Sequence, residues 1–428
     1  MAELVETLYQ KYLECRKVST DSRAEQDNTL FFALDGPNFK GSVFAEPALA
    51  KGARYAVVQD PAVTGPNIIQ VPDTLAALQA LALHHRQQLS IPFIGITGSN
   101  GKTTTKELIN AVLSQKFNVL CTKGNLNNHI GVPLTVLSIQ PDHELAIIEM
   151  GANKPGDIAE LCSYALPTHG IITNIGKAHL EGFGSLEGVA RTKSELYVHL
   201  DNVSGTVFVN TANEHLMRMS RRIEKKVTYY GPQDDYSAEL LQAAPQVIYR
   251  AANGETVHTH LMGSYNFENM AAAACIGQYF GVPHAQINAA IAGYEPTNNR
   301  SQIVRKDTNT ILLDAYNANP SSMALSVSNF AQMEGDQKVV ILGDMRELGQ
   351  ESEAEHRLLG EQLAQQNFTQ VFLCGHEMRY AAEVNPDFRY FAEKSALEIW
   401  LNDHPVRNSH VLIKGSRGIG LETVVDLL

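Results

Sequence analysis

A glycine-rich stretch at residues 97–104, TGSNGKTT, carries residue types that can hold the phosphates of a nucleotide. Where such a turn joins a strand to a helix, several backbone N–H groups point at one anion, and the helix N-terminus adds a partial positive charge. In this pattern Lys102 would reach the terminal phosphates and the Thr103 hydroxyl would bind Mg²⁺. Ile96 stands where the general pattern has its first glycine, so the alternative is a glycine turn that only begins an ordinary helix. The coincidence of strand, turn, Gly-Lys-Thr and helix favours the nucleotide site.

Two residues farther along the chain could add to such a site. Glu149 ends the apolar run LAIIEM, where a carboxylate can meet a metal across from a phosphate loop. The alternative is a solvated acid at a strand end, and the upstream loop favours the metal role. His179 follows the run GIITNI, and a single histidine of this kind is usually a satisfied surface or core residue. Neither HExxH nor CxxC spacing is present, so a zinc enzyme is not expected.

These residues follow short apolar runs that predict the elements needed to position them. We expect strands at residues 93–97, 145–150 and 170–175, and a helix at residues 102–115 with Leu108, Ile109, Val112 and Leu113 on one face. The last third of the chain repeats the pattern with ILLD, KVVILGD, VFLCG and HVLIKG. Short apolar strands that end in Asp, Gly or Lys are typical of open parallel sheets, which bind ligands at the carboxyl ends of their strands. The sequence therefore predicts an α/β protein.

Two breaks in this pattern divide the chain. The first lies at residues 89–92, after a helical run at 74–88, and the second lies at residues 294–300, where YEPTNNR is typical of a linker. We therefore expect three domains, at residues 1–91, 92–296 and 297–428, each of ordinary domain size.

Composition restricts the partners. The chain has 428 residues and a net charge of −12, with 44% hydrophobic and 19% charged residues, as in folded proteins. An acidic surface argues against nucleic acid and anionic membranes as partners. No stretch reaches 18 consecutive apolar residues, so no membrane-spanning segment is expected. The first residues do not resemble a secretory signal, and we therefore expect a cytoplasmic protein. The five scattered cysteines fit reduced, buried thiols.

Five motifs, in this order, carry a resemblance to a known family: GITGSNGKTTTKE, EMGA, TNIGKAHLEGFGS, YNFENMAAAA and DAYNANPSSM. The chain resembles the Mur ligases of bacterial cell-wall synthesis over nearly its whole length. DAYNANP followed by LGDMRELG is most similar to the members that add D-alanyl-D-alanine to a UDP-muramoyl-tripeptide. The DNPR motif of the diaminopimelate-adding members is absent.

The resemblance implies an ATP-dependent amide ligase. Its small-molecule substrates would be UDP-N-acetylmuramoyl-tripeptide, D-Ala-D-Ala and ATP with Mg²⁺, and its products the pentapeptide nucleotide, ADP and phosphate. It also implies a UDP-sugar-binding N-terminal domain, a central P-loop ATPase-type domain with a parallel or mixed sheet, and a Rossmann-like C-terminal domain. We expect the protein to act as a monomer.

The resemblance also implies roles for individual residues. Lys102 would hold the β- and γ-phosphates, Thr103 and Glu149 one Mg²⁺, and His179 a second. Lys193, which by itself reads as a solvated lysine, would be a carbamate that binds metal. The catalytic set would thus be Lys102, Glu149, His179 and Lys193.

Other family positions match residues that would bind the substrates. The ATP contacts would be Gly98, Ser99, Asn100, Gly101, Lys102, Thr103, Thr104, Asn269, Arg300 and Asp314. The UDP-linked substrate would contact Ser22, Arg23 and Asn128. Because Arg300 and Asp314 lie beyond the second boundary, we expect the third domain to close over the nucleotide by a hinge at residues 298–300.

Three alternatives stay open at this point. One is a sister Mur ligase or a folylpolyglutamate-type ligase with another amino-acid acceptor. A second is a nucleotide-dependent switch without ligase activity, against which the joint presence of Lys102, Glu149, His179 and Lys193 argues. A third is a phosphotransferase that stops at a phosphorylated product.

Overall fold

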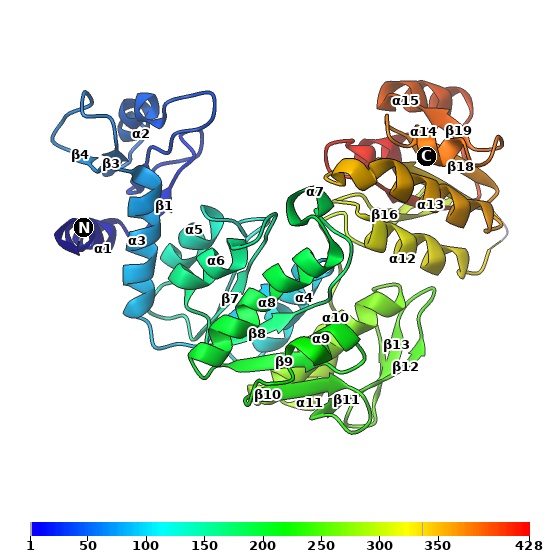
Figure 1. The fold of residues 1–428 in the computed structure, drawn as a ribbon, viewed down its shortest axis with the longest axis horizontal. Coiled ribbons are helices and arrows are strands. Elements are labelled where there is room, and N and C mark those ends of the chain that lie inside the picture. Colours follow the sequence, from blue (N-terminus) through cyan, green and yellow to red (C-terminus); the bar gives the residue numbers. More distant parts are fainter. Residues whose placement is uncertain (1, 336) are drawn as a thin grey trace.

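Four β-sheets organise the chain in the computed structural model, which describes residues 2–335 and 337–428. We call residues 2–87 the N-terminal lobe, residues 93–292 the central lobe and residues 302–427 the C-terminal lobe. Figure 1 shows the N- and C-terminal lobes at opposite ends of the long axis, with the central lobe between and below them. Among the described residues, no helix is long and apolar enough to cross a membrane.

The N-terminal lobe has a parallel four-stranded sheet in the order β1-β2-β3-β4. Its elements are α1 (Ala2–Cys15), β1 (Val18–Ser19), β2 (Leu30–Phe32), η1 (Gly41–Phe44), α2 (Ala45–Ala50), β3 (Tyr55–Val58), β4 (Ile68–Gln70) and α3 (Thr74–Gln87). Helix α3 joins this lobe to the next, because Arg86 is buried and donates to the carbonyl oxygens of Ala165 and Leu166 at 3.0 and 2.9 Å. The Tyr12 hydroxyl adds a bond to the Leu137 carbonyl oxygen at 2.8 Å.

The central lobe is built on a seven-stranded parallel sheet in the order β11-β10-β9-β8-β5-β7-β6. Its strands are β5 (Phe93–Thr97), β6 (Val119–Cys121), β7 (Leu145–Glu149), β8 (His169–Ile172), β9 (Thr206–Asn210), β10 (Lys226–Tyr230) and β11 (Tyr236–Ser237). A small antiparallel sheet follows, of β12 (Glu239–Gln242), β13 (Ile248–Arg250) and β14 (Thr256–His258). The helices are α4 (Lys102–Leu113), α5 (Gly131–Leu137), α6 (Asp157–Ala165), α7 (Leu180–Phe183), α8 (Leu186–Asn202), α9 (Glu214–Met219), α10 (Ser264–Tyr279) and α11 (His284–Ala292).

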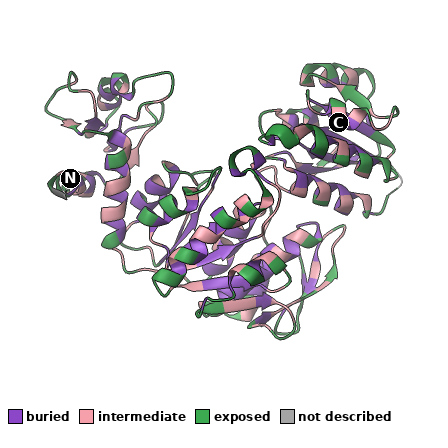
Figure 2. Ribbon diagram, viewed as in Figure 1, coloured by how far each residue is buried: buried purple, intermediate pink, exposed green. Residues whose placement is uncertain are grey.

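Both faces of this sheet are covered, which is why the central strands β5 and β7 are apolar up to their last residues. Successive residues of a strand point to opposite faces. Ala146 and Ile148 of β7 therefore pack in a core with α5, α6 and α8, whereas Leu145 and Ile147 pack in a second core with α4, α10 and α11. Figure 2 shows the buried strands running through the middle of the lobe. This core fixes the carboxyl ends of β5, β7 and β8 beside one another.

The C-terminal lobe has a six-stranded sheet in the order β15-β16-β20-β17-β18-β19, parallel except for the edge strand β15. Its strands are β15 (Gln302–Lys306), β16 (Asn309–Asp314), β17 (Lys338–Gly343), β18 (Gln370–Cys374), β19 (Arg389–Phe391) and β20 (His410–Lys414). The helices are α12 (Pro320–Ala331), η2 (Gly349–Glu351), α13 (Ser352–Ala364), α14 (Arg379–Ala382), α15 (Lys394–Asp403) and η3 (Leu421–Leu427). Asp314 and Lys414 are register partners at the ends of adjacent strands.

The α/β prediction is confirmed, and the elements around the glycine-rich loop lie close to their predicted bounds. The strand at residues 93–97 is β5, and the helix predicted to reach residue 115 ends at Leu113. The strand predicted at residues 170–175 ends at Ile172, because Asn174 uses its carbonyl oxygen to accept from the glycine-rich loop instead of continuing the sheet. The five cysteines are free; Cys121 is half-buried and the others are buried.

Candidate active site

The turn between β5 and α4 requires glycine at two positions. Gly98 and Gly101 have φ angles of +143° and +78°, in a region that other residues rarely adopt. A Cβ atom on Gly98 would lie 2.0 Å from the Thr173 hydroxyl oxygen, and one on Gly101 would lie 2.7 Å from Asn269 Oδ1. The chain therefore turns so that the first N–H groups of α4, which lack helical partners, face one point.

The segment after β8 holds this turn in place. The Ser99 and Asn100 N–H groups donate to the carbonyl oxygen and Oδ1 of Asn174, at 3.1 and 2.9 Å. The Thr173 hydroxyl donates to the Asn100 carbonyl oxygen at 2.6 Å, and the Gly176 N–H donates to Ser99 Oγ at 2.9 Å. These bonds fix the shape of the loop without a ligand.

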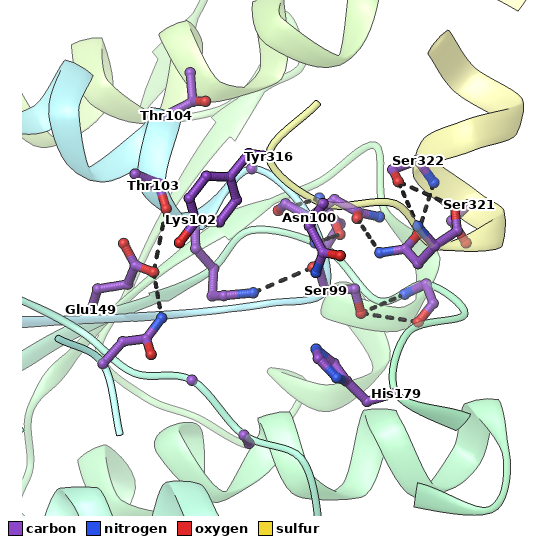
Figure 3. A pocket seen from close by; sticks show the side chains of 18 of the residues that line it. Ser99, Asn100, Lys102, Thr103, Thr104, Glu149, His179, Tyr316, Ser321 and Ser322 are labelled. Carbon is purple, nitrogen blue, oxygen red and sulfur yellow. Dashed lines mark hydrogen bonds between the residues drawn. The ribbon is translucent and has the colours of Figure 1, made fainter. Parts of the chain in front are cut away.

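Lys102 folds back over the loop that precedes it. Its ammonium donates to the Gly98 carbonyl oxygen at 2.7 Å and to the Ser99 carbonyl oxygen at 3.3 Å. Figure 3 shows the Lys102 side chain directed toward Ser99. Burial lowers the pKa of Lys102 to about 8; Glu149 opposes this shift and Arg300 adds to it. An anion bound at the loop would favour the charged form of the lysine.

Glu149, at the end of β7, is buried opposite α4. Its Oε1 accepts from Asn127 Nδ2 at 2.8 Å and from the Thr103 hydroxyl at 3.3 Å (Figure 3). Its Oε2 lies 3.5 Å from Lys106 Nζ and has no hydrogen-bond partner among the described residues. A buried carboxylate oxygen without a donor, beside a threonine hydroxyl, fits a hard cation that takes oxygen ligands.

Within residues 2–335 and 337–428, no three His, Cys, Asp or Glu side chains cluster as a metal site. Mg²⁺ does not require such a cluster, because it is usually bound by one or two carboxylates together with phosphate oxygens and water. The donor set of Thr103 and Glu149 therefore fits Mg²⁺ that arrives with a nucleotide.

The loop opens into a cavity of about 1090 Å³ between the central and C-terminal lobes. Of the residues predicted for the site, those that line it are Ser99, Asn100, Gly101, Lys102, Thr103, Thr104, Asn128, Glu149, His179, Asn269, Arg300 and Asp314. Gly98 contributes its carbonyl oxygen to Lys102, from behind the lining. One cavity thus brings together residues from most of the chain.

The C-terminal lobe contacts the glycine-rich loop directly. Asn319, which caps α12, donates from Nδ2 to Asn100 Oδ1 at 2.7 Å. Arg300 lies 3.7 Å above the centre of the Tyr316 ring, and its Nε is buried without a hydrogen-bond partner among the described residues. The arginine therefore retains a donor that faces no protein acceptor.

Asp314 lines the same cavity, but its oxygens have protein partners. Oδ1 accepts from the Ser301 N–H at 3.2 Å, and Oδ2 accepts from Lys414 Nζ at 2.5 Å and from Ser326 Oγ at 2.9 Å. These bonds tie the linker to the ends of β16 and β20.

His179 is the N-cap residue of α7 and has a φ of 51°, and its ring lies across the cavity from Glu149 (Figure 3). Its Nδ1 forms an ion pair with Oε2 of Glu347, which follows β17 in the C-terminal lobe. The contact with His179 lowers the pKa of the Glu347 carboxyl.

The reading of Lys193 as a solvated lysine is wrong, because only 2% of this residue is exposed. Helix α8 places its ammonium over the Phe183 ring, 5.4 Å from the centroid. Burial, and then the positive charge of Lys102, hold the pKa of Lys193 well below its usual range. Lys193 lies outside the lining of the cavity.

Side-chain hydrogen bonds hold Asn269 between α4 and the start of its own helix, α10. Its Oδ1 accepts from the Thr105 hydroxyl at 3.0 Å, and its Nδ2 donates to Asn266 Oδ1 at 3.1 Å. Asn266 in turn donates to the Met262 carbonyl oxygen at 2.7 Å.

The residues predicted for the UDP-linked substrate lie apart from one another. Arg23 forms a 2.9 Å ion pair with Asp21 on the surface of the N-terminal lobe, and neither Ser22 nor Arg23 lines the cavity. Asn128 does line it, and its Oδ1 accepts from the N–H groups of Ile130 and Gly131, before and at the start of α5.

Sequence reasoning missed several residues of this site: Lys106, Asn127, Asn174, Tyr316, Asn319, Glu347 and Lys414. Asn127 stands next to Asn128 in GNLNNH, and Asn319 and Glu347 lie in DAYNANP and LGDMRELG. The motifs were therefore visible, but the sequence did not show which of their side chains reach the cavity.

Comparisons with known proteins give a consistent result. The chain matches the Mur ligase family, catalytic domain, over residues 14–86, the Mur ligase middle domain over residues 96–277, and the Mur ligase, glutamate ligase domain, over residues 299–417. It is 34% identical to the UDP-N-acetylmuramoyl-tripeptide–D-alanyl-D-alanine ligase of Bacillus subtilis, and 35% identical to that of Escherichia coli. Each match covers 96% of this chain and 93% of the relative.

Solved structures agree. A crystal structure of MurF from Acinetobacter baumannii matches with a TM-score of 0.88 at 30% identity, over 99% of this chain and 98% of that one. MurF ligase from Thermotoga maritima in complex with ADP matches with a TM-score of 0.85 at 27% identity, over 97% of both chains.

Proposed function

The chain belongs to the Mur ligase family, and we propose that it joins D-alanyl-D-alanine to UDP-N-acetylmuramoyl-tripeptide at the expense of ATP. The products are UDP-N-acetylmuramoyl-pentapeptide, ADP and phosphate, so the reaction supplies a precursor of peptidoglycan. The full-length identity to ligases named for this reaction supports the choice of substrates over those of a sister ligase.

The reaction has two steps. An oxygen of the tripeptide carboxylate attacks the γ-phosphorus of ATP, the bond to the β–γ bridging oxygen breaks, and ADP leaves. The dipeptide amine then attacks the acyl carbon, loses a proton, and the acyl–oxygen bond breaks to release phosphate. Activation is needed because the negative charge of a free carboxylate repels nucleophiles.

The observation that carries the proposal is the single cavity in which the phosphate loop meets side chains of the C-terminal lobe. The first N–H groups of α4 and Lys102 would bind and orient the phosphates, and Thr103 and Glu149 would hold Mg²⁺. The bound cation would neutralise phosphate charge, so that a carboxylate can approach. Asn269, Arg300 and Asp314 would shape the rest of the nucleotide site, with Asp314 acting by holding the linker.

His179 and Lys193 would complete a second cation site. Because its pKa is lowered, Lys193 holds more neutral amine than an exposed lysine, and a neutral amine can add to CO₂ with loss of one proton. The resulting carbamate would offer carboxylate-like oxygens to metal.

The UDP-linked substrate would contact Ser22, Arg23 and Asn128, the first two from the N-terminal lobe. We further propose a cytoplasmic monomer with domains at residues 1–91, 92–296 and 297–428. The N-terminal domain would bind the UDP-sugar and the C-terminal domain the dipeptide.

Mass spectrometry of products from UDP-tripeptide, D-Ala-D-Ala and MgATP tests the proposal, together with ADP release. We expect a product that gains one dipeptide, with ADP formed only when the amine is present. Ligation of single amino acids in preference to the dipeptide would instead support a sister ligase. A phosphorylated end product, or ATP left intact with all reactants present, would contradict the proposal.

A further inference from the structure

Glu347 belongs to LGDMRELG, a motif to which the proposed reaction gives no role. The residue follows β17 in the C-terminal lobe, yet its carboxylate reaches His179 Nδ1 in the central lobe. Its carbonyl oxygen also accepts from the Glu181 N–H at 3.1 Å. Both the side chain and the backbone of one residue therefore hold the start of α7.

The contact determines which nitrogen of His179 is available. Because Nδ1 lies in an ion pair with a carboxylate, which cannot donate a proton, a proton on Nδ1 is favoured in a neutral His179 ring, and the lone pair is then on Nε2. Histidines that bind metals commonly donate their other ring N–H to a carboxylate, which fixes both the tautomer and the ring orientation. The left-handed backbone of His179 is an uncommon conformation that its surroundings must maintain.

We propose that Glu347 is a positioning residue, which holds His179 with Nε2 ready for a cation. The inference rests on the cation-binding role of His179 in the proposed function. Because Glu347 comes from the C-terminal lobe, the second cation site is complete only when that lobe is docked on α7. Docking would thereby be coupled to metal binding.

Neighbouring contacts show that the lobes meet at this point without Glu347. Lys177 Nζ donates to Glu355 Oε1 at 2.5 Å, and the Lys177 N–H donates to Ser321 Oγ at 2.9 Å. The Glu347 side chain is 55% exposed, and exposed ion pairs contribute little to stability. The Glu347 carboxylate is therefore not the main link between the lobes. Its position suits it to orient the His179 ring.

The test compares Glu347→Ala and Glu347→Gln with Glu351→Gln in the full-length protein. Glu351 is exposed four residues farther along, and its carboxylate has no hydrogen bond or ion pair with a described residue. Mn²⁺ binding with ADP present is measured by electron paramagnetic resonance, and the His179 tautomer by NMR of ¹⁵N-labelled histidine. Loss of the His179 signals in His179→Gln assigns them.

We expect Glu347→Ala to weaken Mn²⁺ binding about 10–100-fold, as outer ligands of metal sites commonly do. The variant should also lose the single Nδ1–H tautomer of His179. Glu347→Gln, whose amide oxygen still accepts, should restore the tautomer and part of the affinity, and Glu351→Gln should match the unchanged protein. The unfolding midpoint of Glu347→Ala should equal that of Glu351→Gln.

Unchanged Mn²⁺ affinity and an unchanged tautomer in Glu347→Ala would overturn the inference, even if the unaltered protein ligates its substrates. Weaker Mn²⁺ binding by Glu347→Ala, together with a lower unfolding midpoint and an unchanged His179 tautomer, would also overturn the inference. That pattern would mean that Glu347 only links the two lobes structurally. If the unaltered protein did not ligate its substrates, the proposed function would be contradicted instead. The His179 tautomer can be measured whether or not ligation occurs, so the two failures are distinguishable.

Discussion

Lys102 is half-buried and Lys193 is buried, and their surroundings suit them to different roles. Lys102 donates to two carbonyl oxygens of the glycine-rich loop and lines the cavity, where its charge would face a phosphate in the proposed function. Lys193 lies behind that lining over an aromatic ring, where burial and the charge of Lys102 both lower its pKa. The first lysine therefore suits charge neutralisation, and the second suits chemistry that needs a neutral amine.

Replacing Lys102 by alanine removes the cation at the loop. We expect kcat to fall by at least about 10²-fold, the usual effect of deleting one group that stabilises developing charge. ADP release measures the change, and Lys123→Ala, at an exposed position, is the control. Activity of Lys102→Ala equal to that of Lys123→Ala would show that this ammonium does not act on the phosphates.

Replacing Lys193 by alanine removes the amine that would carry a carbamate. We expect turnover to be lost and then partly restored by formate or acetate, which can supply carboxylate oxygens at the vacated place. The measurement is product formation against added carboxylate, with Lys102→Ala as a variant that should not respond. Full activity of Lys193→Ala without additives would remove the proposed role.

The strand–turn–helix unit β5–α4 owes its shape to backbone conformation and to one close approach. Gly101 and Gly254 have similar φ angles, +78° and +85°, but only Gly101 lies against another side chain. A Cβ on Gly101 would meet Asn269, whereas nothing lies within 4 Å of one on Gly254. This pair separates the cost of the conformation from the cost of disturbing the site.

We expect Gly101→Ala and Gly254→Ala each to lose about 1 kcal/mol or more of unfolding free energy, because both force alanine into the left-handed region. Only Gly101→Ala should also weaken ADP binding, since its Cβ displaces Asn269 at the loop. Denaturant unfolding and calorimetric titration give the two quantities. Equal ADP affinity in both variants would mean that the loop tolerates the extra atom.

His169, the first residue of β8, should make the stability of the protein depend on pH. His169 packs on Phe208, Tyr279 and Phe280, and burial lowers its pKa to about 4. In the unfolded chain a histidine titrates near about 6.5, so the unfolded state binds the proton first as the pH falls. This contribution to stability is therefore fully present above about pH 6.5 and is lost as the pH falls toward 4.

The unfolding free energy should decrease between pH 6.5 and pH 4, and replacing His169 by glutamine should make this decrease smaller by about 1–3 kcal/mol. Its absolute stability should also drop, because the ring contacts are lost, so the comparison is between the slopes. Urea titrations at several pH values provide them, with exposed His258→Gln as the control. A slope in His169→Gln as steep as in the control would show that other groups cause the acid sensitivity.

At the scale of the whole molecule, the cavity exists because two lobes far apart in sequence meet over one loop. Asn319 contacts Asn100 although 219 residues separate them, and Lys177 contacts Glu355 across 178 residues. The linker between the lobes is tied to the C-terminal lobe by the bond from the Ser301 N–H to Asp314. Movement of the C-terminal lobe would therefore change the nucleotide site directly.

We expect the lobes to draw together around bound ligands, with a hinge at residues 298–300. Small-angle X-ray scattering should give a smaller radius of gyration when a non-hydrolysable ATP analogue with Mg²⁺ and the UDP-tripeptide are added. Lys102→Ala should show a smaller change at the same concentrations, because its nucleotide site is weakened. Superimposable scattering curves with and without ligands would contradict the closure.

Much of the site could be predicted from sequence where its parts are local. The glycine-rich loop was predicted because turn, lysine, threonine and helix are adjacent in the chain. The apolar runs predicted β5 and β7, since burial on both faces leaves only the last residue of each strand polar, Thr97 and Glu149. Lys193 was misread, because one lysine in a helix carries no local sign of the aromatic ring and second lysine that surround it.

By itself, then, the sequence determined the α/β class, the glycine-rich turn between β5 and α4 and, by resemblance, the family. The tertiary structure alone decided that Glu347 faces His179, that Asn319 reaches Asn100, and that Asp314 is engaged by Lys414. The physical reason is the distance along the chain over which each feature is decided. Backbone conformation and strand patterning depend on neighbours in the chain, whereas the partner of a buried charge depends on which lobes fold against each other.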